Sequence, residues 1–174
     1  SKKAARILRK IYDPLFLIET PMVVTQLETA ELIKYAANCF LATKISFINE
    51  IANVCEALGA DVQMVAKGIG MDRRIGGKFL HAGPGYGGSC FPKDTLALAA
   101  FARAAGTRVG VVEATIAANE NQMKRMVGKI VKAIGSPRGK RVGILGLTFK
   151  PNTDDLRAAP AFKIIAGLKR RGVK

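Results

Sequence analysis

Residues 26–58 read QLETAELIKYAANCFLATKISFINEIANVCEAL, a run without proline or glycine. Together with Gly59 as a C-cap, this composition predicts one long helix. The sequence therefore predicts a mainly helical fold built around this element. Apolar and small side chains recur along it at helical spacing and predict a stripe that faces a core: Leu32, Tyr35, Ala36, Cys39, Phe40, Thr43, Phe47, Ile51, Val54 and Leu58.

Shorter helices are predicted on both sides of the long one, over residues 2–11, 62–68, 94–105 and 109–134. Asp13-Pro14 ends the first of them, and Asp61 can N-cap the second. Glycines stop the last two and interrupt residues 109–134 softly at Gly128. We expect an extended connector over residues 15–24 and a glycine-rich loop over residues 68–88.

The sequence changes character at Gly139. Residues 140–147, KRVGILGL, predict a buried strand that leads into a glycine turn, and residues 161–171 have the apolar spacing of a helix. This pair predicts the first βα unit of a doubly wound, Rossmann-like α/β domain. Because one strand and one helix cannot cover a sheet, we expect a fragment. Its parts would be a helical domain over residues 1–135, a linker near 136–139, and the truncated start of an α/β domain over 139–174.

The composition excludes several classes of protein. With 174 residues and 49% hydrophobic content, the chain can bury a core, and no apolar run is long enough to span a bilayer. No signal peptide is visible, and the three cysteines form neither a disulfide framework nor a CxxC pair. We therefore expect a cytoplasmic protein with no membrane partner and no metal.

A net charge of +15 is the strongest sign of a nucleic-acid partner. However, the basic residues are scattered through helices, and the aromatic content of 6%, without tryptophan, is poor for stacking on bases. A small anionic ligand such as a nucleotide sugar explains the charge as well. The favoured prediction is that nucleic acid is not a partner.

Residues 83–94, GPGYGGSCFPKD, carry the clearest chemical signal in the chain. The glycines let the backbone turn tightly and approach a ligand, and Pro92 suits the first turn of a helix. Cys90 would then lie at the positive end of a helix dipole, with Lys93 nearby, where a thiolate is favoured. The alternative is a small buried cysteine, as the apolar surroundings of Cys39 and Cys55 predict for those two residues. Cys90 lacks such surroundings and is the candidate covalent nucleophile.

Other polar residues have both a structural and a functional interpretation. Glu31, Lys34 and Asn38 form one polar stripe on the long helix, either facing solvent or projecting a lysine and an amide into a cavity. Asn49 and Glu50 on the same helix are interpreted as structural.

The glycine-rich region and the residues after the predicted strand hold further candidates. Arg73-Arg74 either faces solvent or clamps an anion, and His81 has no second ligand that would indicate a metal site. The turn Gly146–Lys150 lacks the spacing of a dinucleotide-binding loop.

Four motifs in order resemble those of the UDP-glucose/GDP-mannose dehydrogenase family, and the resemblance spans nearly the whole chain. They are ELIKYAAN at 31–38, FINE at 47–50, GPGYGGSCFPKD at 83–94 and GILGLTFK at 143–150. GIGMDRRIG at 68–76 is similar to the UDP-glucose branch of the family. The resemblance implies oxidation of UDP-glucose to UDP-glucuronate with two NAD, through a thiohemiacetal and a thioester on a cysteine. It also implies a homodimer built on the long central helix.

The same motifs imply roles for individual residues. Cys90 matches the nucleophile, Lys34 the lysine that stabilises charge on the reacting oxygen, Asn38 its helper amide, and Asp94 the carboxylate that orders or activates water. Lys93 and Arg157 match contacts to NAD. The substrate-binding positions are Lys34, Asn38, Arg74, Phe79, Leu80, His81, Ala82, Gly83, Gly87, Phe149 and Lys150. Arg74 matches an arginine that reaches the neighbouring subunit's substrate.

The chain departs from the family pattern in three ways. No segment matches the NAD-binding domain with its GxGxxG loop, the UDP-binding domain is only begun, and His81 stands where a lysine is frequent. We therefore expect the chain to be inactive by itself and assign the activity to its parent enzyme. The alternatives are a GDP-mannose or UDP-N-acetylmannosamine dehydrogenase, a dimerisation module without chemistry, and a basic nucleic-acid-binding module.

Overall fold

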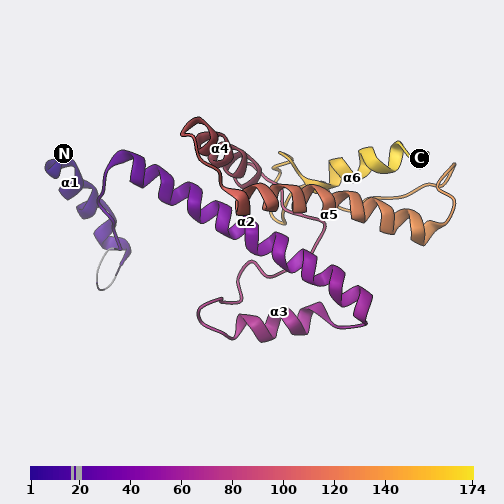
Figure 1. Cartoon of the computed structure of the whole chain (residues 1–174). Helices are drawn as coiled ribbons and strands as arrows, with labels where there is room; N and C mark the ends of the chain where they lie inside the picture. Colours follow the sequence, from indigo (N-terminus) through magenta and orange to yellow (C-terminus); the bar gives the residue numbers. More distant parts are fainter. Residues whose placement is uncertain (17, 19–20) are drawn as a thin grey trace. The chain divides into compact units, whose positions relative to one another are not determined.

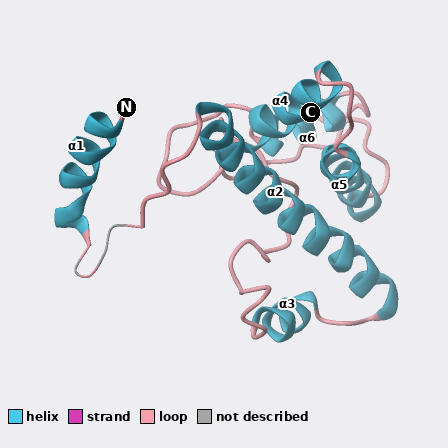
Figure 2. Ribbon diagram, turned by 60° about the vertical axis from the view of Figure 1, so that its left-hand side comes forward, coloured by secondary structure: helices cyan, strands magenta, loops and turns pink. Residues whose placement is uncertain are grey.

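The computed structural model describes residues 1–16, 18 and 21–174, which divide into two compact units, Ser1–Lys34 and Tyr35–Lys174. Figure 1 labels the elements along the chain, and Figure 2 shows the same helices joined by loops. The two units are described separately. The predicted division at residues 136–139 stays a prediction.

The first unit holds helix α1, Lys2–Tyr12, and the first turns of α2, Leu27–Leu58. The Ser1 hydroxyl caps α1 by accepting a hydrogen bond from the Ala4 N–H at 3.2 Å. A short 3-10 turn, Asp13–Leu15, ends α1 at Pro14, as the sequence predicts. The predicted connector over residues 15–24 includes residues 17, 19 and 20, which lie outside the described residues.

The second unit contains the rest of α2 and four further helices: α3, Val62–Gly70; α4, Phe91–Ala104; α5, Gly110–Ile134; and α6, Pro160–Lys169. All of them agree with the predicted helices, with small changes in their ends. Helix α4 begins three residues earlier than predicted because Pro92 occupies its first turn and Cys90 is its N-cap. Helix α5 continues through Gly128, where the sequence predicts a soft break.

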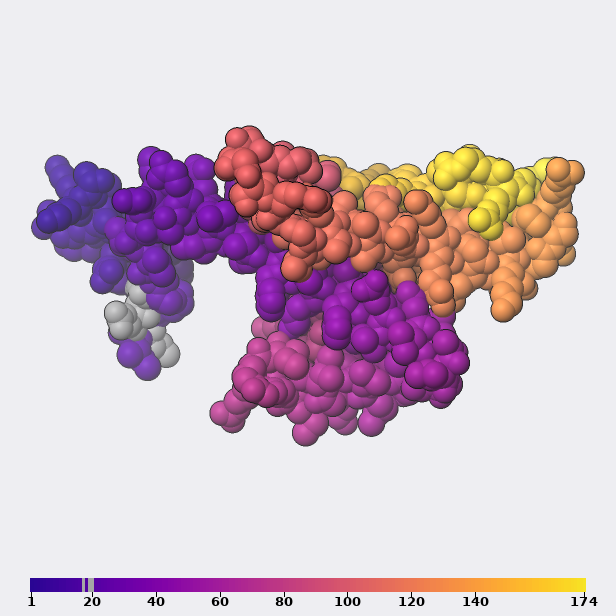
Figure 3. Space-filling view, viewed as in Figure 1, coloured from indigo at the N-terminus to yellow at the C-terminus, as the bar shows by residue number. Residues whose placement is uncertain are grey.

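Helices α5 and α6 share a small apolar core. Val127 of α5 packs with Ile164 and Leu168 of α6 and with Val173. Gly167 allows this close approach, because a Cβ there would lie 2.6 Å from a methyl carbon of Val127. In the space-filling view the two helices (orange and yellow) lie against each other (Figure 3).

The prediction of a strand at residues 140–147 is wrong, because the described part of the chain contains no strand. Those residues lack the ladder of hydrogen bonds that defines a strand. A beginning of parallel pairing is present: the Lys174 N–H donates to the Lys140 C=O at 2.8 Å, and the Val142 N–H donates to the Lys174 C=O at 3.2 Å. Of the predicted βα unit, the helix is thus present as α6. In place of the strand there is one parallel contact, and no sheet forms in the described residues.

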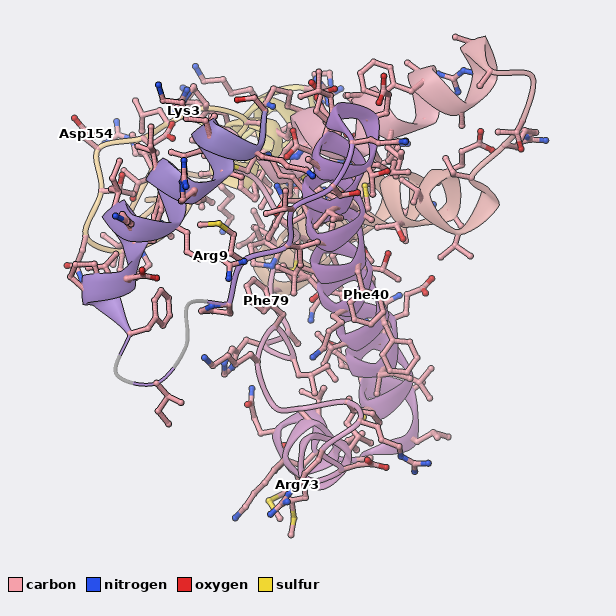
Figure 4. All side chains as sticks on the ribbon, turned by 90° about the vertical axis from the view of Figure 1, so that its left-hand side faces the viewer. Lys3, Arg9, Phe40, Arg73, Phe79 and Asp154 are labelled. Atoms are coloured by element: carbon pink, nitrogen blue, oxygen red, sulfur yellow. The ribbon has the colours of Figure 1, made fainter. Side chains whose placement is uncertain are left out.

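The predicted apolar stripe on α2 is also corrected. The large side chains Phe40, Phe47, Val54 and Leu58 are 66%, 49%, 52% and 76% exposed. Figure 4 labels Phe40, whose side chain projects from α2. Cys39 of the predicted stripe is buried as expected, but the buried face of α2 otherwise carries mostly small or polar side chains outside the stripe: Ala42, Ser46, Ile48, Asn49 and Cys55. Helix α2 therefore presents a large apolar surface outward.

Candidate active site

The glycine-rich loop before α4 packs closely against residues 149–160. A Cβ at Gly87 would lie 2.3 Å from the Ala158 carbonyl oxygen, and a Cβ at Gly88 would lie 2.7 Å from the Phe149 ring. Gly85 and Gly88 also have positive φ angles of 120° and 86°, which other residues rarely adopt. Glycine at these positions is therefore a requirement of both backbone conformation and space.

Side-chain amides from α2 and α5 hold the backbone of this loop. Asn49 Oδ1 accepts from the Gly83 N–H at 2.7 Å, and Gln122 Nε2 donates to the Gly83 C=O at 2.9 Å. Asn119 bonds to both the N–H and the C=O of Tyr86, at 2.8 and 3.1 Å. Asn49 thus has a structural role, as predicted, whereas the roles of Asn119 and Gln122 were not predicted. The available signal was amide side chains within otherwise apolar helical stretches.

Cys90 lies where the loop meets α4. Its carbonyl accepts from the Asp94 N–H at 2.8 Å, and its Sγ lies 3.7 Å from the Ser89 hydroxyl oxygen. The Cys90 side chain is exposed, whereas Cys39 and Cys55 are only 3% and 5% exposed. The predicted contrast between one open and two buried cysteines is confirmed.

A cavity of about 850 Å³ opens in front of Cys90, within the size range of small-molecule sites. The residues that line it come from α2, the glycine-rich loop, the start of α4, and residues 149–150: Asn38, Leu41, Ile45, Lys78, Phe79, His81, Gly83, Pro84, Gly85, Tyr86, Gly87, Ser89, Cys90, Phe91, Phe149 and Lys150. None of these is acidic, and Lys78 and Lys150 are cationic. The cavity is therefore suited to an anionic ligand that also carries an apolar or ring surface.

Asp94 is fully buried below the surface of this region. Its carboxylate accepts from Asn38 Nδ2 at 2.5 Å and from Lys93 Nζ at 2.6 Å, so two partners offset the cost of its burial. The Asp94 hydrogen bond is the main cause that raises the pKa of Lys93. Burial, followed by the Asp94 charge, raises the pKa of the Cys39 thiol. These contacts join Asn38, which lines the cavity, to the first turn of α4.

Arg157 is bonded to the glycine-rich loop two residues before Cys90. Its carbonyl accepts from the Gly88 N–H at 3.0 Å. Its guanidinium forms a bidentate pair with Asp155, at 2.9 and 2.8 Å, which lowers the pKa of Asp155 to about 2. The pKa of Arg157 is raised mainly by Asp155, with a smaller contribution from Cys90. Of the two predicted cofactor contacts, Lys93 thus lies in the first turn of α4 after Cys90, and Arg157 bonds to the loop that precedes Cys90.

Of the predicted substrate residues in the second unit, three lie outside the cavity lining. Leu80 is 3% exposed and belongs to the core, and Ala82 does not line the cavity. Arg74 follows Arg73, which Figure 4 labels, and its side chain is 89% exposed. It forms a bidentate pair with Asp72 of its own loop, which lowers the pKa of Asp72. The ion pair with Asp72 therefore sets the orientation of the Arg74 side chain, which does not line the cavity.

Lys34 belongs to the first unit, and its predicted role beside Cys90 stays a prediction. Among residues 1–16, 18 and 21–174, no group of three histidine, cysteine or acidic side chains is placed to hold a metal ion. Within the same residues, none of the helices combines the length and the apolar character needed to cross a membrane.

Comparisons with known proteins show which family the chain belongs to. Residues 28–121 match the central domain of the UDP-glucose/GDP-mannose dehydrogenase family, and residues 143–174 match the UDP binding domain of that family. The chain is 54% identical to the UDP-glucose 6-dehydrogenase of Rhizobium meliloti and 54% identical to the UDP-glucose 6-dehydrogenase TuaD of Bacillus subtilis. Each comparison covers 99% of this chain, but only 40% and 37% of the length of these curated relatives.

A solved structure is also similar, that of a UDP-glucose dehydrogenase from Pyrobaculum islandicum. Its TM-score is 0.92 at 41% identity, over 100% of this chain and 40% of that chain. The fold that presents Cys90 beside its cavity is thus the fold of part of a nucleotide-sugar dehydrogenase. This chain belongs to the UDP-glucose/GDP-mannose dehydrogenase family.

Cys90 is expected to react selectively with a small thiol reagent. Because its side chain is exposed and the other two thiols are buried, iodoacetamide should label it at least about tenfold faster. Mass spectrometry of the three cysteine-containing peptides measures the rates. Equal labelling of all three peptides in the folded chain would contradict the described site.

Proposed function

We propose that this chain supplies the substrate cavity and the nucleophile of an NAD-dependent UDP-glucose 6-dehydrogenase, which oxidises UDP-glucose to UDP-glucuronate. The observation that carries the proposal is the place of Cys90. Its exposed side chain stands at the N-terminus of α4 and lines a cavity of about 850 Å³ without acidic side chains. The similarity to enzymes named UDP-glucose 6-dehydrogenase supports this substrate over GDP-mannose or UDP-N-acetylmannosamine.

The cavity lining fits a nucleotide sugar in charge and in shape. Lys78 and Lys150 can neutralise a diphosphate, while Phe79 and Phe149 offer ring surfaces for a base or a sugar. His81, Gly83 and Gly87 complete the lining on the loop side, and backbone without side chains allows close approach of the sugar. Leu80 and Ala82 then act by shaping the loop, and Arg74 is left to serve a neighbouring subunit.

The chemistry begins when the C6 alcohol loses two electrons and two protons and becomes an aldehyde. Cys90 Sγ adds to the aldehyde carbon and forms a thiohemiacetal. Loss of a hydride from that carbon and of a proton from its hydroxyl oxygen leaves a thioester. Water then adds to the thioester carbonyl and the C–S bond breaks, which yields the carboxylate and restores the thiol.

NAD, when bound, accepts the hydride in each oxidation. Lys93 and Arg157 fit this cofactor, since both are cations on exposed side chains, Lys93 in the first turn of α4 after Cys90 and Arg157 next to the glycine-rich loop, where its C=O accepts from the Gly88 N–H. The only GxGxxG spacing in this sequence, residues 83–88, lies in the loop before α4 and follows no strand among the described residues, so we expect most of the dinucleotide site to come from elsewhere in the enzyme.

Three residues around the reacting carbon have distinct tasks. Lys34 stabilises the developing oxyanion, and Asn38 donates to the same oxygen. Asp94, buried and bonded to the Asn38 amide at 2.5 Å, fixes the orientation of that amide and orders the hydrolytic water. Because the reaction requires a free thiol, a reducing compartment such as the cytoplasm suits the enzyme.

Replacing the nucleophile tests the proposed function. In the whole enzyme, Cys90→Ser should lower the rate of UDP-glucuronate formation by at least about a thousandfold, because no sulfur is available to capture the aldehyde. The matched control is Cys55→Ala, which removes a buried thiol of α2 and should leave the rate nearly unchanged. Turnover to the acid at the wild-type rate by the Cys90→Ser variant would reject the assignment.

We also infer that the enzyme is a homodimer through α2. Phe40, Phe47 and Val54 are exposed and follow one another at intervals of seven residues, the repeat of a helix–helix seam. Leu58 extends the same apolar surface to the end of the helix. A contiguous apolar face of this kind is rarely left to solvent. A second copy of the chain would cover it by the same contacts in both directions.

A charged substitution on this face tests the dimer. Phe47→Asp should raise the dissociation constant at least about tenfold, since a carboxylate would have to be desolvated in the seam. Analytical ultracentrifugation over a concentration series measures it. The control Val111→Asp adds the same charge at another exposed apolar position, on α5, and should have no effect. An unchanged dimer in the Phe47→Asp variant would place the interface elsewhere.

A further inference from the structure

We propose that Asn49, Asn119 and Gln122 are positioning residues for Cys90, acting through the backbone of residues 83–86. This inference rests on the proposed function, because it assigns the residues that fix the nucleophile of that reaction. All three are buried, with exposed fractions of 1%, 5% and 8%, and none of them lines the cavity. Their effect on chemistry must therefore be indirect.

The three side chains bond to both backbone polar groups at each end of the turn. At Gly83, Asn49 accepts a hydrogen bond from the N–H at 2.7 Å and Gln122 donates one to the C=O at 2.9 Å. At Tyr86, Asn119 accepts from the N–H at 2.8 Å and donates to the C=O at 3.1 Å. The turn is thus attached to α2 at one point and to α5 at three. Since both helices are long and continuous, the turn inherits their rigidity.

The attachment is tight enough to fix the path of the chain. A Cβ at Gly85 would lie only 2.8 Å from Asn119 Oδ1, so the side-chain amide fills the space beside the turn. Gln122 is itself oriented, because its Oε1 accepts from Asn53 Nδ2 at 3.1 Å. An amide that is bonded on both sides cannot rotate without breaking a buried hydrogen bond.

Only residues 87–89 separate this turn from Cys90, and they too are constrained. The Gly88 N–H donates to the Arg157 C=O at 3.0 Å, and Gly87 abuts the Ala158 carbonyl. A free segment with this glycine content would sample many conformations. The amides of α2 and α5 restrict these conformations, because they hold the backbone of residues 83–86 by hydrogen bonds. The position of Sγ relative to the sugar is then set before substrate binds.

Misplacing Cys90 affects the two oxidations unequally. Conversion of the alcohol to the aldehyde forms no bond to sulfur, whereas conversion of the aldehyde to the acid requires Sγ to reach the carbonyl carbon. A fault in positioning should therefore slow the second oxidation more than the first. A general loss of folded protein would lower both rates by the same factor, so the ratio of the two rates separates the two causes.

The test uses the whole enzyme with two substitutions that keep size and shape. Asn119→Asp and Gln122→Glu each replace an N–H donor to a loop carbonyl by a second acceptor, which repels it. Rapid mixing measures the rate of the first NADH formed with UDP-glucose, which reports only the first oxidation, and separately the rate of NADH formation with the C6 aldehyde. The control is Asn121→Asp, which introduces the same charge on the exposed side of α5.

In the Asn119→Asp and Gln122→Glu variants, we expect the rate with the aldehyde to fall at least about tenfold more than the rate with UDP-glucose. The Asn121→Asp variant should leave the ratio of the two rates unchanged. Equal loss with both substrates, or wild-type rates with both, would overturn the positioning role. Cys90→Ser in the same assay isolates the proposed function. If that variant oxidises the aldehyde normally, the proposed function fails; if it does not, only the role of the amides is in question.

Discussion

Hydrogen bonds between buried side-chain amides and a glycine-rich backbone are the constraint on which the site depends. Glycine is required at positions 85, 87 and 88 because the backbone is strained or crowded there, yet glycine makes a segment mobile. Asn119 and Gln122 resolve this conflict by bonding to the backbone itself, which needs no side chain on the loop. The result is a loop that is open to a ligand and still fixed.

The same region joins two parts of the family architecture. The loop and α4 lie in the segment that matches the central domain, while Phe149 and Lys150 lie in the segment that matches the UDP binding domain. Both segments line one cavity. The Phe149 ring lies against Gly88, so the segment that matches the UDP binding domain packs directly beside the loop that precedes Cys90. In the proposed enzyme, this packing of the Phe149 ring against Gly88 would link nucleotide binding to the presentation of the thiol.

Features with local causes could be predicted from the sequence, and features that depend on pairing could not. The helices, their caps and the contrast between Cys90 and the buried cysteines follow from neighbouring residues alone. Phe47 and the other large apolar residues at the same spacing are exposed and do not face the core of the chain. Helical spacing predicts an apolar face, but it does not predict which surface covers that face. The strand at residues 140–147 failed because a ladder needs a partner strand. The bonds of Asn49 and Gln122 to the loop could not be predicted, since their partners lie far away in sequence.

The most direct test of the central claim, that Cys90 bonds to the sugar carbon, needs no oxidation. The C6 aldehyde of the substrate, labelled with ¹³C at the aldehyde carbon, is mixed with the whole enzyme without NAD and observed by ¹³C NMR. The thiol adds to the aldehyde without any oxidant, so the adduct can form in the absence of NAD. A new signal from a sulfur-bound carbon should therefore appear with the wild-type enzyme and be absent with the Cys90→Ser variant. Spectra with only the free aldehyde and its hydrate, identical for both proteins, would contradict the claim.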